Sequence, residues 1–162
     1  MRTHFQFKPK DIDAFKRKLL KWANSFNEVV WLDSNLYSQK HSSFDAVLAV
    51  DAFTSMQISK NHDFRELENY KKKTSDWIFG YLSYDLKNNI EKLHSSNFDG
   101  LHFPDLFFFQ PKKVFVFQGG EVYLNYLNEF SSSIEKDLIS IEEELIKSTE
   151  KSSLELNIKA RT

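Results

Sequence analysis

Apolar residues recur at three- and four-residue steps near the start of the chain, at Ile12, Phe15, Leu19, Trp22 and Phe26. This period predicts a helix that buries one apolar stripe. Asp11, which follows Pro9 by two positions, is placed to cap the first turn. The opposite side of the helix is expected to be solvated and carries Lys16, Arg17, Lys18 and Lys21.

Two later segments have the spacing of a capping box, in which a short polar residue is followed three positions on by glutamate. Asp63 and Glu66 predict a short helix over 63–72, with Phe64, Leu67 and Tyr70 facing inward. Ser132 and Glu135 predict an amphipathic helix that ends near Lys147. Its expected buried stripe consists of Ile134, Leu138, Ile141 and Leu145.

Short runs of β-branched and aromatic residues predict strands over 29–32, 44–53 and 77–84. The run over 44–53 is almost continuously apolar, which is typical of a strand in the centre of a sheet. Gly80 lies inside the third run. A glycine there indicates a bulge, or a place where another backbone or a ligand comes close.

The clearest local pattern is a hairpin, with runs at 113–117 and 121–126 on either side of Gly119-Gly120. Two glycines accept the positive φ angles of a tight turn. A separate strand at 106–109 precedes the hairpin, and residues 154–159 alternate like a further strand.

These elements predict an α+β fold with mostly antiparallel sheet or sheets in a sandwich-like core and two or three flanking helices. The polar, turn-rich residues 88–100 are expected to form a surface excursion. No repeat or linker divides the chain, so residues 1–162 are expected to be a single domain.

Composition and charge narrow the class of protein. With 41% hydrophobic residues and sixteen Phe, the chain has enough apolar area for one core without metals or disulfides. The formal net charge of -1 provides no broad positive field, so nucleic acid is not an expected partner. No apolar run approaches the roughly 20 residues that span a bilayer, and the N-terminus lacks a signal-peptide core. We therefore expect a cytoplasmic protein without membrane contact.

The sequence lacks the spacing of helical His pairs, Cys clusters, phosphate loops and nucleophile elbows. We assign no catalytic residue and expect no metal or other cofactor in this chain. Polar groups meet aromatic surroundings in two segments, at the strand end 31–34 and around the glycine at 80–85. Strand ends over a core form small-ligand pockets. The alternative interpretation is that Asp33 and Ser34 form an Asx-type turn and that the tyrosines of 80–85 pack the sheet.

In their order along the chain, these segments resemble component I of para-aminobenzoate (aminodeoxychorismate) synthase. They are more distantly similar to component I of anthranilate synthase, within the chorismate-binding enzymes. The similarity extends from about Val29 to Thr162. It is carried by Trp31-Leu32-Asp33-Ser34, by Ser42-Ser43-Phe44-Asp45-Ala46-Val47-Leu48-Ala49, by Trp77-Ile78-Phe79-Gly80-Tyr81-Leu82-Ser83-Tyr84-Asp85-Leu86, and by Phe103-Pro104-Asp105-Leu106-Phe107-Phe108-Phe109-Gln110-Pro111.

The resemblance implies a non-catalytic N-terminal scaffolding or regulatory domain of an enzyme that aminates chorismate to aminodeoxychorismate, for para-aminobenzoate and folate synthesis. It implies that the chorismate site and the magnesium-binding glutamates lie in a C-terminal catalytic domain absent from this chain. The implied partners are that domain and a glutamine amidotransferase subunit. An isolated domain with uncovered strands and apolar surface is also expected to self-associate.

Two alternatives remain open: the N-terminal domain of anthranilate synthase component I, and a stand-alone module that binds an aromatic amino acid. In several members of the family this region holds a tryptophan between sheets, as a feedback inhibitor or a structural ligand. The resemblance implies that Leu32, Asp33 and Ser34 would line that effector pocket, with Ser34 as hydrogen-bond partner and Tyr37 and Phe44 as walls. The motif departs from the usual Leu-Leu-Glu-Ser by having Trp31 and Asp33, and Ser43 replaces an arginine often found after the serine.

Overall fold

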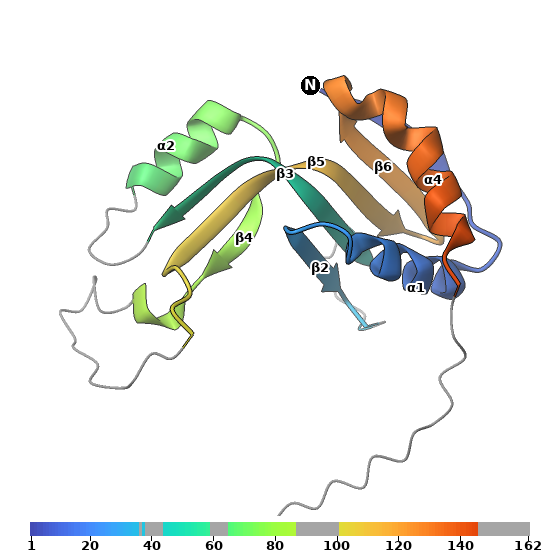
Figure 1. Ribbon diagram of the computed structural model, residues 1–162, viewed down its shortest axis with the longest axis horizontal. Helices are drawn as coiled ribbons and strands as arrows, with labels where there is room; N and C mark the ends of the chain where they lie inside the picture. The colour runs from blue at the N-terminus through green and yellow to red at the C-terminus, as the bar shows by residue number, and fades with distance from the viewer. Residues whose placement is uncertain (36, 38–43, 59–64, 87–100, 146–162) are drawn as a thin grey trace, which may run out of the picture.

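The computed structural model of the 162-residue chain describes residues 1–35, 37, 44–58, 65–86 and 101–145. Its six strands form one antiparallel sheet (Figure 1). Along the main path the strands are β1 (Arg2–Phe7), β6 (Glu121–Leu127), β5 (Leu106–Gln118), β3 (Ala46–Ile58) and β2 (Val29–Asp33). Strand β4 (Phe79–Leu82) lies off this path and pairs with β5.

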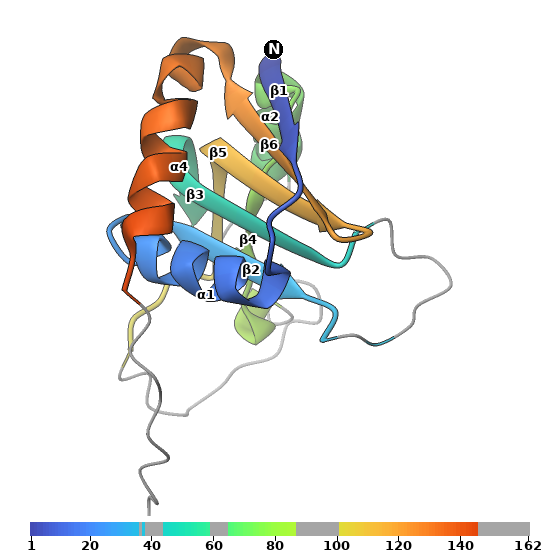
Figure 2. The same ribbon diagram turned by 90° about the vertical axis from the view of Figure 1, so that its right-hand side faces the viewer.

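Among the described residues three α-helices flank the sheet, which confirms the α+β class and its mostly antiparallel pairing. Helices α1 (Ile12–Ala23) and α4 (Ile134–Glu143) lie together on one side of β1, β6, β5, β3 and β2 (Figure 2). Helix α2 (Arg65–Thr74) lies beside the other end of β3 and β5. The described residues also include two short 3-10 turns, η1 (Tyr84–Leu86) and η2 (Asn128–Ser133).

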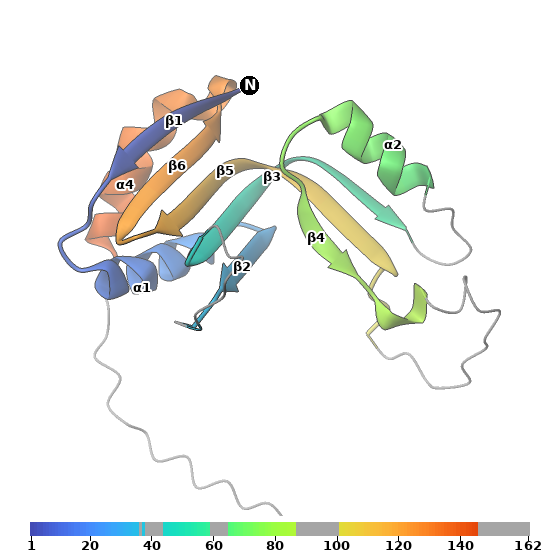
Figure 3. The same ribbon diagram turned by 180° about the vertical axis from the view of Figure 1, so that it is seen from behind.

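The sheet bends where β3 and β5 cross from one end of the molecule to the other (Figures 1 and 3). We call the part with β1, β2, β6, α1 and α4 the large half. It includes residues 46–50 of β3 and 113–118 of β5. We call the part with β4 and α2 the small half, which includes residues 54–58 and 106–110.

The main core lies between the large half of the sheet and its two helices. Alternate strand residues point to the same face, so Leu48, Phe115 and Leu124 meet the stripe of α1. The predicted stripe is confirmed, because Phe15, Leu19 and Trp22 are buried and Ile12 and Phe26 pack against them. The Asp11 cap is also confirmed, since its carboxylate accepts from the Ala14 N–H at 2.9 Å.

The glycine predictions are confirmed in two places. Gly119 and Gly120 have φ angles of 59° and 82° in the β5–β6 turn. At Gly80 another backbone does come close: a Cβ there would lie 2.7 Å from Phe108 Cα and would overlap the Phe107 carbonyl oxygen. The strand predicted over 77–84 is shorter, four residues long, and is followed by η1.

The strands predicted separately at 106–109 and 113–117 are one 13-residue strand, β5. Pro111 lies within this strand and has no N–H to donate. The pairing with β3 nevertheless continues on both sides of it, with a register shift between Ala52 and Thr54 that accommodates the proline.

The prediction for α4 was wrong at both ends. Ser132 lies in η2 and not at the cap, and the helix begins at Ile134 after Ser133. The helix ends at Glu143, so Leu145 is 80% exposed and does not extend the buried stripe. Lysines of α1 hold its end, because Lys18 Nζ donates to the Glu142 carbonyl oxygen at 2.6 Å and satisfies a terminal acceptor.

Four further points concern the sequence predictions. Strand β1 was not predicted. Lys16 is not solvated as expected: its side chain is only 18% exposed and is paired with Asp33. Helix α2 buries no residue completely, although Leu67 packs partly against Ile58. The predictions for Asp63, for Phe64 and for residues 88–100 and 154–159 lie outside the described residues.

Candidate functional site

The predicted effector site lies at the end of β2, where the chain turns beside the start of β3. Leu32 and Asp33 are the last residues of the strand, and the Ser34 N–H donates to the Asp45 carbonyl oxygen at 2.9 Å. The Tyr37 N–H donates back to the Ser34 carbonyl oxygen at 2.9 Å. The main chain thus brings Asp33 and Ser34 beside Asp45, the residue that follows Phe44.

The carboxylate of Asp33 is engaged within the fold. One of its oxygens accepts from the Asn35 N–H at 2.8 Å, and Asn35 has a φ of 49°, so an Asx-type turn forms here. The other oxygen lies 3.2 Å from Lys16 Nζ. The turn interpretation therefore describes what Asp33 does in the structure, and this carboxylate already has two partners.

The side chains around this turn point to two different sides of the sheet. Trp31 belongs to the helix-covered core, and its ring centre lies 5.7 Å from that of Phe117 and 5.9 Å from Lys16 Nζ. Leu32, the next residue, is 48% exposed on the opposite face, and Phe44 is 38% exposed. Tyr37 is 73% exposed, so most of its ring lies in solvent. The structure thus places Leu32, Asp33, Ser34 and Phe44 around one turn, and tryptophan binding there stays a prediction.

The second predicted segment, around Gly80, is part of a larger apolar surface. On the face of the sheet away from α1 and α4, a cluster forms entirely from strand residues. We call this cluster the helix-free face. It consists of the buried residues Val47, Ala49, Phe109 and Val114 and the partly buried residues Val30, Ala52, Phe79, Phe107 and Val116.

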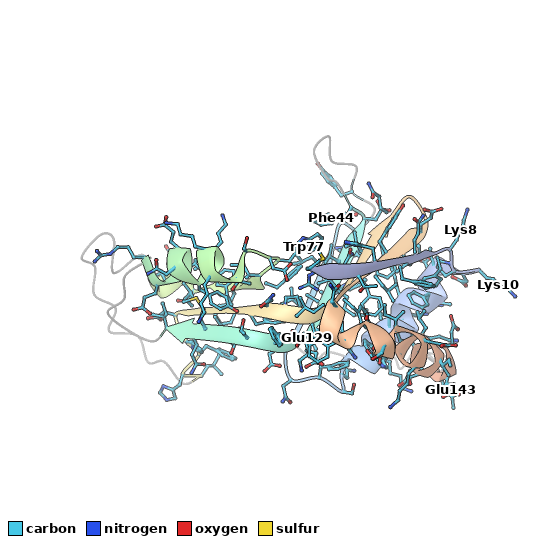
Figure 4. The ribbon with its side chains drawn as sticks, turned by 90° about the horizontal axis from the view of Figure 1, so that it is seen from above. Lys8, Lys10, Phe44, Trp77, Glu129 and Glu143 are labelled. Atoms are coloured by element: carbon cyan, nitrogen blue, oxygen red, sulfur yellow. The ribbon has the colours of Figure 1, made fainter. Side chains whose placement is uncertain are left out.

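Aromatic rings continue this face over the small half. The ring centres of Tyr81 and Phe107 lie 6.2 Å apart, those of Phe107 and Phe109 lie 5.9 Å apart, and those of Trp77 and Phe79 lie 6.0 Å apart. Trp77 is 43% exposed and Tyr81 is 39% exposed. Figure 4 shows Trp77 and Phe44 on the side of the molecule away from α4 and its Glu143.

The structure also brings together a polar cluster that the sequence did not reveal. Arg2 in β1 meets Asp76, which precedes β4, through bonds from Nε at 2.9 Å and from Nη2 at 2.9 Å. Gln110 Nε2 donates to the same carboxylate at 2.8 Å. Burial raises the pKa of Asp76, but hydrogen bonds from Arg2, Gln110 and the Trp77 N–H and the charge of Arg2 outweigh it and hold that pKa below its ordinary value of 3.8.

A second ion pair is buried under α4. Lys113 Nζ lies 2.7 Å from Asp137 Oδ2, with side-chain exposures of 9% and 12%. The lysine also faces aromatic rings, 5.1 Å from the centre of Phe26 and 5.3 Å from that of Trp22. Tyr126 donates to Asp137 at 3.1 Å, and burial, followed by the charge of that carboxylate, raises the pKa of Tyr126 far above its usual range. This pair joins β5 to α4 inside the core.

Together these features define the class of protein: an α+β fold whose sheet has one face covered by α1 and α4 and one apolar face that no described helix covers. No family model and no curated protein matches the chain. Among the described residues, no three His, Cys, Asp or Glu side chains are grouped closely enough to hold a metal ion. None of the helices in the described part of the chain is long and apolar enough to cross a membrane.

Proposed function

We propose that this chain is the non-catalytic N-terminal domain of a component I synthase that aminates chorismate to aminodeoxychorismate. In this proposal its helix-free face packs against the catalytic domain of that enzyme. The observation that carries the proposal is an apolar sheet face that no described helix covers, with partly exposed aromatic rings at its rim. Such a composition is typical of the centre of a protein interface, where aromatic residues are enriched.

The resemblance described above also supports the helix-free face as the binding surface. All four segments that carry it contribute to the helix-free face or border it. The first supplies Leu32 at its edge, and the other three supply Val47, Phe79 and Phe107 within it. A binding role for this face therefore accounts for why these segments, far apart in the chain, share one surface.

The centre of this face is already buried within the chain. The apolar surface that a partner would bury lies at its rim, where Leu32, Trp77 and Tyr81 are 48%, 43% and 39% exposed. Removing apolar surface from water contributes roughly 25 cal/mol per Å². The exposed side chains at its edge would be covered by a partner that presents its own apolar surface. The glutamine amidotransferase subunit is a further proposed partner, and magnesium is assigned to the catalytic domain and not to this chain.

The test uses this chain and a separately produced catalytic domain of an aminodeoxychorismate synthase component I. We expect a complex in sedimentation velocity, and amination of chorismate in the presence of ammonia and magnesium that increases when this chain is added. Tyr81→Lys should weaken the binding of the two domains and the increase in amination at least tenfold each, because it places a charge in the interface. Ile139→Lys is the matched control, since Ile139 is 54% exposed on α4 and lies away from the face.

Equal binding by both variants would refute the use of this face, and the lack of any complex would refute the proposed partner. The coding sequence gives an independent check, because the proposal predicts a reading frame that continues past Thr162 into a catalytic domain.

The effector site is tested separately. Within the described residues the Ser34 main chain is held by the bond to Asp45, while no hydrogen bond to its hydroxyl is formed there. In this proposal the Ser34 hydroxyl forms a hydrogen bond with a polar group of a bound aromatic amino acid. Calorimetric titration with tryptophan should give saturable heat that Ser34→Ala removes. The absence of heat in the unchanged protein would eliminate both this site and the stand-alone binding module.

A further inference from the structure

The two halves of the sheet are joined by β3 and β5 at a place where the strand ladder is irregular. The register of the β3–β5 pair shifts between Ala52 and Thr54, and Asp51 has a φ of 64°. Pro111 lies opposite Ala52 and has no N–H to donate. Bulges and prolines bend strands and interrupt their hydrogen bonds, so the backbone alone leaves the angle between the halves weakly determined.

Arg2 binds to both sides of this bend. On the large half, its Nη1 donates to the Asn125 carbonyl oxygen of β6 at 2.8 Å. At the bend itself, Nη2 donates to the Pro111 carbonyl oxygen at 2.7 Å. On the small half, the guanidinium pairs with Asp76 through both carboxylate oxygens. One side chain from β1 thus contacts three other segments of the chain: β6, β5 and the residues before β4.

Further hydrogen bonds hold the bend from the side of the small half. The Tyr70 hydroxyl of α2 donates to the Thr54 carbonyl oxygen at 2.9 Å and accepts from the Gln110 N–H at 3.0 Å. Gln110 in turn donates to Asp76. Helix α2 and the two bent strands are therefore connected to the carboxylate that Arg2 binds.

We propose that the Arg2–Asp76 pair is a clamp that fixes the angle between the two halves of the sheet. The guanidinium is planar and presents its donors in a rigid fork, so it satisfies these acceptors in one relative arrangement only. The Arg2 side chain is 6% exposed and that of Asp76 is 15% exposed, so solvent competes little with these bonds. A buried ion pair is weak evidence for net stability, and in this proposal the role of the pair is to specify the arrangement of the two halves.

The clamp has a consequence for the helix-free face, because that face extends across the bend. Val47 and Val114 come from the large half, and Phe79 and Phe107 come from the small half. A change in the angle would alter the shape of the face without unfolding either half. This inference goes beyond the proposed function and does not depend on it.

The test measures the distance between the halves in the folded protein. The chain contains no cysteine, so two introduced cysteines carry spin labels at defined positions only. Arg17→Cys places one label on α1 and Asn69→Cys places the other on α2; both residues are exposed and make none of the interactions of the clamp. Pulsed electron-spin resonance then gives the distance distribution.

We expect a single narrow distribution in the parent protein and a shifted or broadened one in Arg2→Met and in Asp76→Asn. Their far-UV circular dichroism should be unchanged. Arg2→Lys should resemble Arg2→Met, because one ammonium cannot reach all the acceptors that the fork reaches. Lys16→Met is the matched control, since it breaks a partly buried pair with Asp33 that lies within the large half.

An unchanged narrow distribution in folded Arg2→Met and Asp76→Asn would overturn the clamp. Equal broadening in Lys16→Met would overturn it as well, because the effect would then follow from the loss of any ion pair. If both Arg2→Met and Asp76→Asn failed to fold, the pair would be required for the fold itself and the assignment of a clamp would be wrong.

Discussion

The substitution Gly80→Ala adds one methyl group at the point where β4 lies against β5. The new Cβ would be 2.7 Å from Phe108 Cα and 2.8 Å from the Phe107 carbonyl carbon, and would overlap the oxygen of that carbonyl. These are backbone atoms of a central strand, which is paired with β3 on its other side. They cannot move away as the end of a flexible side chain would.

The free-energy cost of Gly80→Ala follows from the two strands, β4 and β5, that would have to move apart. Adding a methylene to a packed core costs roughly 1–3 kcal/mol even when side chains can adjust. Here the four residue pairs between β4 and β5 would have to shift, so we expect a loss of at least about 3 kcal/mol. For a domain of this size that loss lowers the melting temperature by roughly 6–12 °C.

Urea denaturation followed by circular dichroism measures the free energy of unfolding of Gly80→Ala against the parent protein. Gly119→Asn is the control, because Gly119 has a φ of 59° that asparagine tolerates and has open space around it. We expect the control to stay within about 0.5 kcal/mol of the parent. If Gly80→Ala unfolded at the same urea concentration as the parent, the close approach of the two strands would be refuted.

Two other predictions concern the ion pairs. Lys113→Met should lower the free energy of unfolding by about 3–5 kcal/mol, because Asp137 loses its ion-pair partner in the core. Adding Asp137→Leu should restore most of the lost free energy. Purely additive losses in urea titrations of the single and double variants would contradict this reasoning. The folded-state pKa of Asp76 lies below its ordinary value of 3.8, so its charge stabilises the protein fully above about pH 4 and this contribution is lost as the pH falls through the folded-state pKa. Asp76→Asn should therefore show a weaker dependence of melting temperature on pH below 4, and an identical acid dependence would argue against the Arg2 pairing.

The elements that the sequence predicted well are those whose signal is local. The stripe and cap of α1 follow from a few neighbouring residues, and the turn at Gly119-Gly120 follows from the φ angles that only such residues adopt freely. Gly80 also gave a correct indication, because a glycine inside a strand has few uses other than close approach.

The elements that were missed depend on partners far along the chain. Strand β1 pairs with β6, so Arg2 lies opposite Leu127, and a six-residue segment gives little signal without that partner. The continuity of β5 across Pro111 is decided by its pairing with β3. The end of α4 is decided by lysines from α1, among which Lys21 Nζ donates to the Leu145 carbonyl oxygen at 3.0 Å.

The same division holds for the candidate sites. The segment at Asp33 and Ser34 could be singled out because a polar pair ends an apolar run, and the Asx-type turn was one of its two interpretations. The clamp could not be found in this way, because its two charged residues are 74 positions apart and neither belongs to a motif.

The sequence by itself determined the α+β class, the antiparallel pairing and the local geometry of turns and caps, because these depend on short-range sterics and on the period of apolar residues. Only the tertiary structure decided where the sheet bends, which apolar face the described helices leave uncovered and which charges meet. Those properties depend on contacts between distant segments, and their positions exist only after the strands have paired.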